Sequence, residues 1–163
     1  MVEDPLTAAV GDLLRARGWR LAVAESCTGG LVGHLITDVA GSSDYFVGGV
    51  IAYSNAAKME LLGVRPETLA RHGAVSEETA REMAGGARRL LGAEVALAVT
   101  GIAGPGGGTP DKPVGLVYLA LDAVNGQVCR RFVWSGDRAA NKAESARAAL
   151  ALLREWLAKG DDH

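Results

Sequence analysis

Three short apolar runs alternate with helix-patterned segments in the first hundred residues, and this alternation limits the possible folds more than any other feature of the sequence. Residues 21–24, 46–53 and 95–99 have the length and composition of buried strands. Strands that are separated by helices pair in parallel, with right-handed crossovers. We therefore expect an α/β domain whose first three strands run in the same direction.

Capping residues mark the helices between and around these strands. Asp4-Pro5 begins a helix that Gly18 ends, and Ser54-Asn55 caps a helix that Gly63 ends. Ser76 opens a longer helix. The expected helices cover about residues 5–17, a segment that begins near residue 31, and residues 55–62, 77–91 and 139–157.

The second half of the chain contains a hairpin. Residues 114–121 and 128–134 flank Asn125-Gly126, a dipeptide typical of tight antiparallel turns. The loop over residues 100–108 is too short and too rich in glycine to cross back over the sheet, so the fourth strand runs against the third and the fifth returns. The expected sheet is mixed, mostly parallel and five-stranded, with one antiparallel strand.

Four polar or glycine-rich segments come together in this topology. They are residues 25–30, 53–58, 100–108 and 135–138. All four lie at the edge where the parallel strands have their carboxyl ends, and ligands of open α/β sheets bind at that edge. The sequence thus predicts one functional site, on a single domain that covers residues 1–163.

Charge and composition argue against several classes of protein. The 17 lysines and arginines are balanced by 19 acidic residues, which leaves no broad basic face, so we expect no nucleic-acid partner. No apolar run reaches the ~18 residues of a membrane-spanning helix, so we expect no membrane partner, and Glu3, Asp4 and Asp12 stand where a signal peptide needs an apolar stretch. With only Cys27 and Cys129 available for a disulfide, we expect a cytoplasmic protein in a reducing compartment.

Ser26 is the first candidate nucleophile, because it lies where the first strand turns into a helix. A lone serine at such a place is more often a helix cap that satisfies a backbone amide. Thr28, Gly29 and Gly30 shift that balance, since a glycine-rich turn lets backbone N–H groups approach an oxyanion or a phosphate. Cys27 is the rival nucleophile, intrinsically more reactive but without an obvious base.

Lys58 is the candidate base. It falls in the first turn of its helix, where a cation opposes the helix dipole. It is either a solvated lysine or a base whose pKa is lowered by burial or by nearby positive charge. Tyr53 ends the preceding strand and is either a functional hydroxyl or a half-buried strand aromatic.

Anion binding is the chemistry that the remaining candidates favour. Thr100, Gly101 and Gly104 lie in a glycine-rich loop that lacks the Gly-Lys-Ser/Thr ending of a P-loop but can still cover a ligand. Arg138, at the start of the last helix, is either an anion ligand or an ordinary surface arginine. No metal-ligand spacing relates the three histidines, His34, His72 and His163.

Several ungapped blocks of sequence resemble the CinA C-terminal domain family, also known as the PncC-type nicotinamide mononucleotide deamidases. The blocks are Ala24-Glu25-Ser26-Cys27-Thr28-Gly29-Gly30, Tyr53-Ser54-Asn55 with Lys58, Gly73-Ala74-Val75-Ser76, Thr100-Gly101-Ile102-Ala103-Gly104-Pro105, Lys112-Pro113-Val114-Gly115 and Ser135-Gly136-Asp137-Arg138. They occur in the family's order and cover nearly the whole chain. The resemblance implies a three-layer α/β/α sandwich around the mixed sheet.

The same resemblance implies a function, which is hydrolysis of the carboxamide of nicotinamide mononucleotide to nicotinic acid mononucleotide and ammonia. By similarity, Ser26, Tyr53 and Lys58 correspond to the family's catalytic residues. We expect backbone amides of residues 27–29 to hold the oxyanion, and Arg138 with the residue 100–104 loop to bind the 5′-phosphate. No metal or organic cofactor is implied.

One competing function remains open at this point, a non-catalytic nucleotide-binding or interaction module linked to competence or the DNA-damage response. Such a module would keep the glycine loop and Arg138 but would have no need of Ser26 together with Lys58. The sequence also leaves open whether the protein forms a homo-oligomer.

Overall fold

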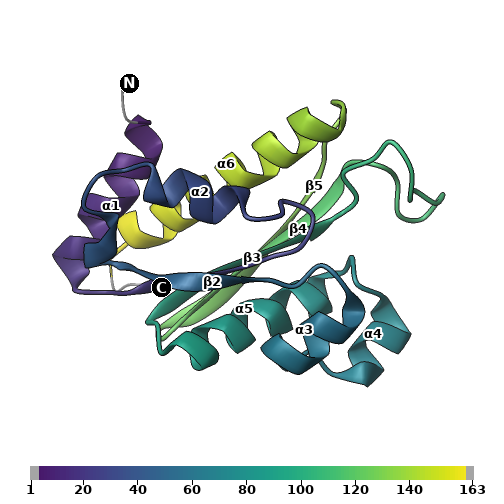
Figure 1. Cartoon of the computed structure of the whole chain (residues 1–163), viewed down its shortest axis with the longest axis horizontal. Coiled ribbons are helices and arrows are strands. Elements are labelled where there is room, and N and C mark those ends of the chain that lie inside the picture. Colours follow the sequence, from purple (N-terminus) through teal and green to yellow (C-terminus); the bar gives the residue numbers. More distant parts are fainter. Residues whose placement is uncertain (1–3, 161–163) are drawn as a thin grey trace.

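Five strands form one sheet in a computed structural model that describes residues 4–160 (Figure 1). The strands lie in the order β2-β1-β3-β4-β5. Their bounds are β1 Leu21–Glu25, β2 Phe46–Ile51, β3 Val95–Gly101, β4 Leu116–Ala123 and β5 Gly126–Val133. β1 pairs in parallel with β2 and β3, and β4 pairs antiparallel with β3 and β5. The predicted α/β topology, with a single antiparallel strand, is confirmed.

Helices cover both faces of the sheet and complete three layers (Figure 1). α1 (Pro5–Arg17), α2 (Leu31–Thr37) and α6 (Arg138–Ala158) lie on one face. α3 (Asn55–Leu62), α4 (Pro66–His72) and α5 (Glu77–Leu91) lie on the other. A short 3₁₀ turn, Ser42–Asp44, precedes β2. The three-layer α/β/α arrangement that the resemblance implied is therefore present.

The side chains of β1 alternate between two hydrophobic cores. Leu21 and Val23 face α1, α2 and α6, where the core consists mainly of Val and Leu. Ala22 and Ala24 face α5, where most of the buried side chains are alanines, so that this helix packs close to the sheet. The same alternation sets which side of the sheet each residue at the carboxyl end of β1 faces.

All five predicted helix caps, Asp4 and Gly18 of α1 included, are present as hydrogen bonds or left-handed turns. The Ser54 hydroxyl accepts a hydrogen bond from the Ala57 N–H at 3.0 Å, and Ser76 accepts one from the Thr79 N–H at 3.2 Å. Gly63 has a φ of 69° and ends α3 in the left-handed conformation that glycine adopts without strain. These caps fix where α3 and α5 begin, and α3 carries Lys58.

Some element boundaries differ from those predicted. β2 ends at Ile51, so Tyr53 lies beyond the strand rather than at its end. β3 continues through Gly101, where we expected a loop to begin at residue 100. Gly101 pairs with Val117 of β4, and this pairing requires glycine, because a Cβ there would stand 2.6 Å from Val117 Cγ2. The hairpin is slightly displaced, with Ala123 paired to Gly126. The sequence pattern predicted neither α4 nor the 3₁₀ turn.

Cys27 and Cys129 are both free thiols. Among residues 4–160, no helix combines the length and the apolar character needed to cross a membrane.

Candidate active site

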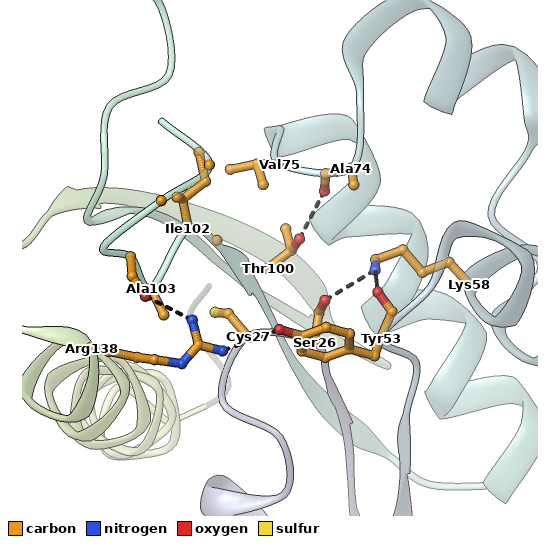
Figure 2. Close-up of a pocket in the computed structure, with 14 residues that line it drawn as sticks. Ser26, Cys27, Tyr53, Lys58, Ala74, Val75, Thr100, Ile102, Ala103 and Arg138 are labelled. Carbon is orange, nitrogen blue, oxygen red and sulfur yellow. Dashed lines mark hydrogen bonds between the residues drawn. The ribbon is translucent and has the colours of Figure 1, made fainter. Parts of the chain in front are cut away.

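A pocket of about 270 Å³ lies at the carboxyl edge of the sheet, where the predicted segments meet (Figure 2). Its walls are Ser26, Cys27, Tyr53, Lys58, Ala74, Val75, the segment of residues 100–104, Gly106, Gly107 and Arg138. Ala74 and Val75, which precede α5, were not predicted to contribute. The convergence of four loops at this edge follows from the strand order and directions.

Ser26 leaves β1 with its side chain turned toward α3. Its backbone N–H donates to the Val99 carbonyl at 3.0 Å, which ties the residue to β3. Because Glu25 points to the α2 side of the sheet, the next residue points to the α3 side. The Ser26 hydroxyl therefore lies at the floor of the pocket, opposite the helix that carries Lys58 (Figure 2).

Lys58 is buried, with only 1% of its surface exposed, so the solvated-lysine interpretation is wrong. Its Nζ lies 3.0 Å from Ser26 Oγ, 2.9 Å from the Ala52 carbonyl and 3.1 Å from the Tyr53 carbonyl. No acidic side chain forms an ion pair with it among the described residues. Burial lowers the pKa of Lys58, because removal from water disfavours the charged ammonium.

The three contacts of Lys58 fit both protonation states: an ammonium donates to all three oxygens, while a neutral amine donates to two of them and accepts from the third. A neutral amine has two N–H donors, which the carbonyls of Ala52 and Tyr53 can accept. Its remaining lone pair then faces the Ser26 hydroxyl at 3.0 Å. In this protonation state the amine accepts the proton of Ser26, which is the arrangement of a nucleophile with its general base.

Cys27 lies beside this pair without sharing its base. The side chain is buried, and burial raises the pKa of the thiol to about 11, with a further contribution from the Glu25 carboxylate. A thiol with that pKa carries almost no thiolate near neutral pH. The chemistry of this pocket therefore favours the Ser26 hydroxyl over the rival thiol.

The turn after Ser26 contains two backbone donors that have no acceptor. No oxygen atom of the described chain accepts a hydrogen bond from the N–H groups of Cys27 and Thr28. The Gly29 N–H, by contrast, donates to the Ser26 carbonyl at 3.1 Å. The Thr28 hydroxyl and the Gly30 N–H both donate to Glu25 Oε1, at 2.6 and 3.2 Å. Of the residues 27–30 that we predicted to bind substrate, Cys27 and Thr28 have free amides, and Cys27 alone of the four lines the described pocket.

Tyr53 contacts the site in a different way from the one expected of a proton relay. Its side chain is 63% exposed, and its hydroxyl accepts a hydrogen bond from Arg138 Nη2 at 3.2 Å (Figure 2). Its backbone carbonyl, rather than its hydroxyl, contacts Lys58. Tyr53 thus accepts a hydrogen bond from Lys58 through its backbone carbonyl and one from Arg138 through its phenol.

Arg138 spans the mouth of the pocket from the start of α6. Its Nη1 donates to the Gly104 carbonyl at 2.8 Å, while Nη2 reaches Tyr53. Asn141, one turn along α6, is buried and joins two loops, since its Nδ2 donates to the Ala103 carbonyl at 3.0 Å and its Oδ1 accepts from the Gly136 N–H at 3.0 Å. The contacts with Gly104 on one side and Tyr53 on the other hold the Arg138 guanidinium over the pocket.

Thr100 and the glycine loop form the wall opposite α3. The Thr100 hydroxyl donates to the Ala74 carbonyl at 2.8 Å, which connects β3 to the segment before α5 (Figure 2). The N–H groups of Ala103, Gly104 and Gly106 have no protein acceptor in the part of the chain that the structure describes. Together with Arg138 they form a cluster of donors suited to an anionic group.

The histidines lie away from this pocket. His34 pairs with Asp38 at 3.4 Å, and His72 lies 3.7 Å from Glu78, while His163 is outside the described residues. Residues 4–160 contain no cluster of three or more His, Cys, Asp or Glu side chains that could hold a metal ion.

The sequence analysis gave no role to two buried polar residues beside the pocket, Asn141 and Glu25, although Glu25 lies in the predicted segment of residues 25–30. Glu25 ends an apolar strand and reads as its polar boundary. The only available signal was an acidic residue immediately before a glycine-rich turn into a helix. Asn141 sits within a helix rich in alanine, and its role depends on loops that come from distant parts of the sequence.

Comparison with known proteins gives a consistent set of relatives. Residues 3–157 match the family described as the CinA C-terminal domain. A CinA-like protein of Synechocystis sp. is 56% identical over 136 residues, which are 83% of this chain and 33% of that protein. A CinA-like protein of Chloroherpeton thalassium is 50% identical over 157 residues, which are 94% of this chain and 37% of that protein. The chain spans about a third of the length of the curated relatives it matches.

A solved structure of nearly the same length is also similar. The crystal structure of the competence damage-inducible protein A from Klebsiella pneumoniae has a TM-score of 0.91 and 44% sequence identity to this chain. The match covers 94% of this chain and 95% of the other.

Proposed function

This chain belongs to the CinA C-terminal domain family, and on that premise we propose that it is an amidohydrolase that releases ammonia from the carboxamide of nicotinamide mononucleotide. One observation carries the proposal. A buried lysine with a lowered pKa lies 3.0 Å from a serine hydroxyl in a pocket lined by free amide donors. That combination supports acyl transfer, because it provides a nucleophile, a base and oxyanion donors within one site.

The reaction begins with attack of Ser26 Oγ on the carboxamide carbon, as Lys58 Nζ takes the hydroxyl proton. The carbonyl oxygen becomes an oxyanion that the free N–H groups of Cys27 and Thr28 can hold. Lys58 then gives its proton to the amide nitrogen and the C–N bond breaks. Ammonia departs, and the acyl group remains bound to Ser26 as an ester. Lys58 next deprotonates a water that cleaves this ester, which frees the carboxylic acid and restores the Ser26 hydroxyl.

Arg138 and the glycine loop supply the anion contacts that a nucleotide needs. The guanidinium lies at the mouth of the pocket, and the free N–H groups of Ala103, Gly104 and Gly106 lie on the adjoining wall. A substrate with its carboxamide on Ser26 at the floor would present its phosphate toward these donors. Recognition of the phosphate thus distinguishes the nucleotide from the riboside.

The competing function is a non-catalytic nucleotide-binding or interaction module. The name of one relative, a competence damage-inducible protein, is compatible with it. Burial of a lysine that has no carboxylate partner is costly. A binding module gains nothing from placing such a lysine next to a serine hydroxyl. The 3.0 Å contact between Lys58 and Ser26 therefore favours the enzyme.

Ammonia release from nicotinamide mononucleotide tests the proposal, with nicotinamide riboside as the comparison substrate. Ser26→Ala should abolish turnover and leave the fold and nucleotide binding intact, whereas Cys27→Ala should keep most of the activity. Arg138→Ala should weaken binding of the nucleotide by about 1.5–3 kcal/mol and leave the riboside almost unaffected, because only the nucleotide offers a phosphate. An active Ser26→Ala variant, or a wild type without amidase activity on the nucleotide, contradicts the proposal.

A further inference from the structure

We propose that Glu25 is a positioning residue for catalysis, which fixes the turn that carries Ser26 and leaves the amides of Cys27 and Thr28 free for the reacting oxygen. The proposal rests on the function proposed above and assigns a role to a residue that does not contact the pocket. Glu25 is 2% exposed and lies on the α2 side of the sheet, opposite Ser26.

The Glu25 carboxylate accepts four hydrogen bonds from the segment that follows it. Oε1 accepts from the Thr28 hydroxyl at 2.6 Å, the Gly30 N–H at 3.2 Å and the Val32 N–H at 2.9 Å. Oε2 accepts from the Gly33 N–H at 3.0 Å. A single side chain therefore ties the turn of residues 26–30 to the first turn of α2.

The carboxylate itself stands on a rigid base. Glu25 is the last residue of β1 and pairs with Ile51 of β2 and Val99 of β3. Its carbonyl accepts a hydrogen bond from the Ala52 N–H at 2.8 Å. Both ends of the Ser26 turn are thus connected to the sheet, one through the backbone and the other through the Glu25 side chain.

This arrangement divides the backbone donors near Ser26 into two groups. Gly30, the N-cap of α2, has no side chain that could accept from the first amides of the helix. The Glu25 carboxylate accepts from them instead, at Gly30, Val32 and Gly33. The amides of Cys27 and Thr28 are left without an oxygen acceptor among residues 4–160. Because the carboxylate occupies the positive end of α2, a substrate phosphate is excluded from that helix terminus and directed toward Arg138.

Oxyanion stabilisation depends on donors that are already aligned before the reaction. Loss of the Glu25 contacts would free the turn of residues 26–30 to move relative to the floor of the pocket. A displacement of about 1 Å at reacting groups can cost on the order of 10²-fold in rate. The expected defect is therefore in kcat, while KM depends mainly on the distant phosphate contacts.

The test compares Glu25→Gln with Glu82→Gln as a matched control. Glu82 is also a carboxylate that accepts from a threonine hydroxyl, Thr68 at 2.6 Å, and from a backbone N–H, Arg65 at 2.9 Å, at the start of α4. It does not line the Ser26 pocket. Both changes keep the side-chain size and remove one acceptor oxygen, so both report the structural cost of losing such a carboxylate.

Three measurements are made on each variant, below its melting temperature. They are kcat and KM for nicotinamide mononucleotide, the rate at which a fluorophosphonate probe modifies Ser26, and the thermal melting temperature. We expect Glu25→Gln to lower kcat and the modification rate together by on the order of 10²-fold, with KM within about threefold of the wild type. Glu82→Gln should lower the melting temperature by less, because Glu82 is 24% exposed and accepts two hydrogen bonds, and it should leave both rates unchanged.

The proposal is overturned if the folded Glu25→Gln variant shows a kcat and a Ser26 modification rate within about twofold of those of Glu82→Gln. If Glu25→Gln does not fold, Thr28→Val decides the question, because it removes only the 2.6 Å hydroxyl contact to Glu25. This variant should show a smaller fall in kcat and in probe modification at unchanged KM, and its failure to do so overturns the proposal.

The fluorophosphonate reaction separates this proposal from the proposed function, since it requires no amide substrate. If the wild type releases no ammonia from the nucleotide but the probe rates still differ between Glu25→Gln and Glu82→Gln, the substrate assignment fails and the role of Glu25 stands. If ammonia is released and the two variants behave alike, Glu25 has no positioning role. A wild type that neither releases ammonia nor reacts with the probe overturns both proposals.

Discussion

Lys58 shows how one buried side chain acquires a chemical role from its surroundings. Two carbonyls and one hydroxyl surround its Nζ, burial lowers its pKa, and no acidic side chain of the described residues forms an ion pair with it that would stabilise the ammonium. The sequence indicated Lys58 as a candidate base, because a cation in the first turn of a helix opposes the helix dipole. It could not show that the side chain is buried, because burial depends on the packing of α3 against distant residues.

Replacement of Lys58 by arginine separates a base from a simple cation. Arginine keeps the positive charge but does not lose its proton in a protein, so Lys58→Arg should lower kcat by ~10²–10⁴-fold with little change in KM. The wild-type rate should rise with pH through the lowered pKa of Lys58, since the neutral amine is the active form. A near-normal kcat and an unaltered pH–rate profile in Lys58→Arg would remove Lys58 from the mechanism.

The same lowered pKa makes stability depend on pH. Between the lowered pKa of Lys58 in the folded protein and the ordinary lysine value in the unfolded chain, the unfolded chain binds one more proton. The free energy of unfolding should therefore rise with pH across that window. Lys58→Met should lose this part of the pH dependence, which urea unfolding at several pH values can measure.

At the scale of elements, the contact between α3 and α5 sets the position of Lys58. Gly86 on α5 allows this contact, because a Cβ there would overlap the carbonyl oxygen of Leu62 at the end of α3. Neighbouring Gly85 is different, since a Cβ there would first meet the flexible end of Arg89 at 3.1 Å. The two adjacent glycines thus provide a test and its control within one helix.

We expect Gly86→Ala to destabilise the protein by about 1–3 kcal/mol and to lower kcat, because α3 must move and carry Lys58 away from Ser26. Gly85→Ala should be neutral or stabilising by about 0.5–1 kcal/mol, since alanine favours the helix more than glycine does. Urea unfolding and ammonia release measure both effects. Equal stability and activity of the two variants would show that the α3–α5 contact does not position Lys58.

The helices differ in how clearly the sequence predicts them. The helix from Pro5 to Arg17 and those capped by Ser54 and Ser76 were predicted, because each has a capping residue and a terminal glycine. α4 was missed although Pro66 begins it and Gly73 ends it, because its seven residues carry little apolar periodicity and its N-cap, Arg65, makes no capping hydrogen bond through its side chain. Short helices of this kind depend on tertiary contacts such as those of Glu82.

At the scale of the whole molecule, the sheet topology and the location of the pocket followed from general rules of chain connection. Those rules placed Ser26, Lys58 and Arg138 at one edge, where the structure brings them around one pocket. They could not predict which side chain contacts which. The phenol of Tyr53 on Arg138, and the carboxylate of Glu25 beneath the Ser26 turn, are set by packing between segments far apart in the sequence.

The central claim is that Ser26 forms an ester with the acyl group of the substrate while ammonia departs. Turnover of nicotinamide mononucleotide in the presence of hydroxylamine tests it most directly, because hydroxylamine intercepts an acyl-enzyme and yields a hydroxamate. We predict that the wild type and Cys27→Ala form the pyridine-3-hydroxamate nucleotide together with ammonia, and that Ser26→Ala forms neither. Ammonia release without any hydroxamate, or hydroxamate formation by Ser26→Ala, would contradict covalent catalysis by Ser26.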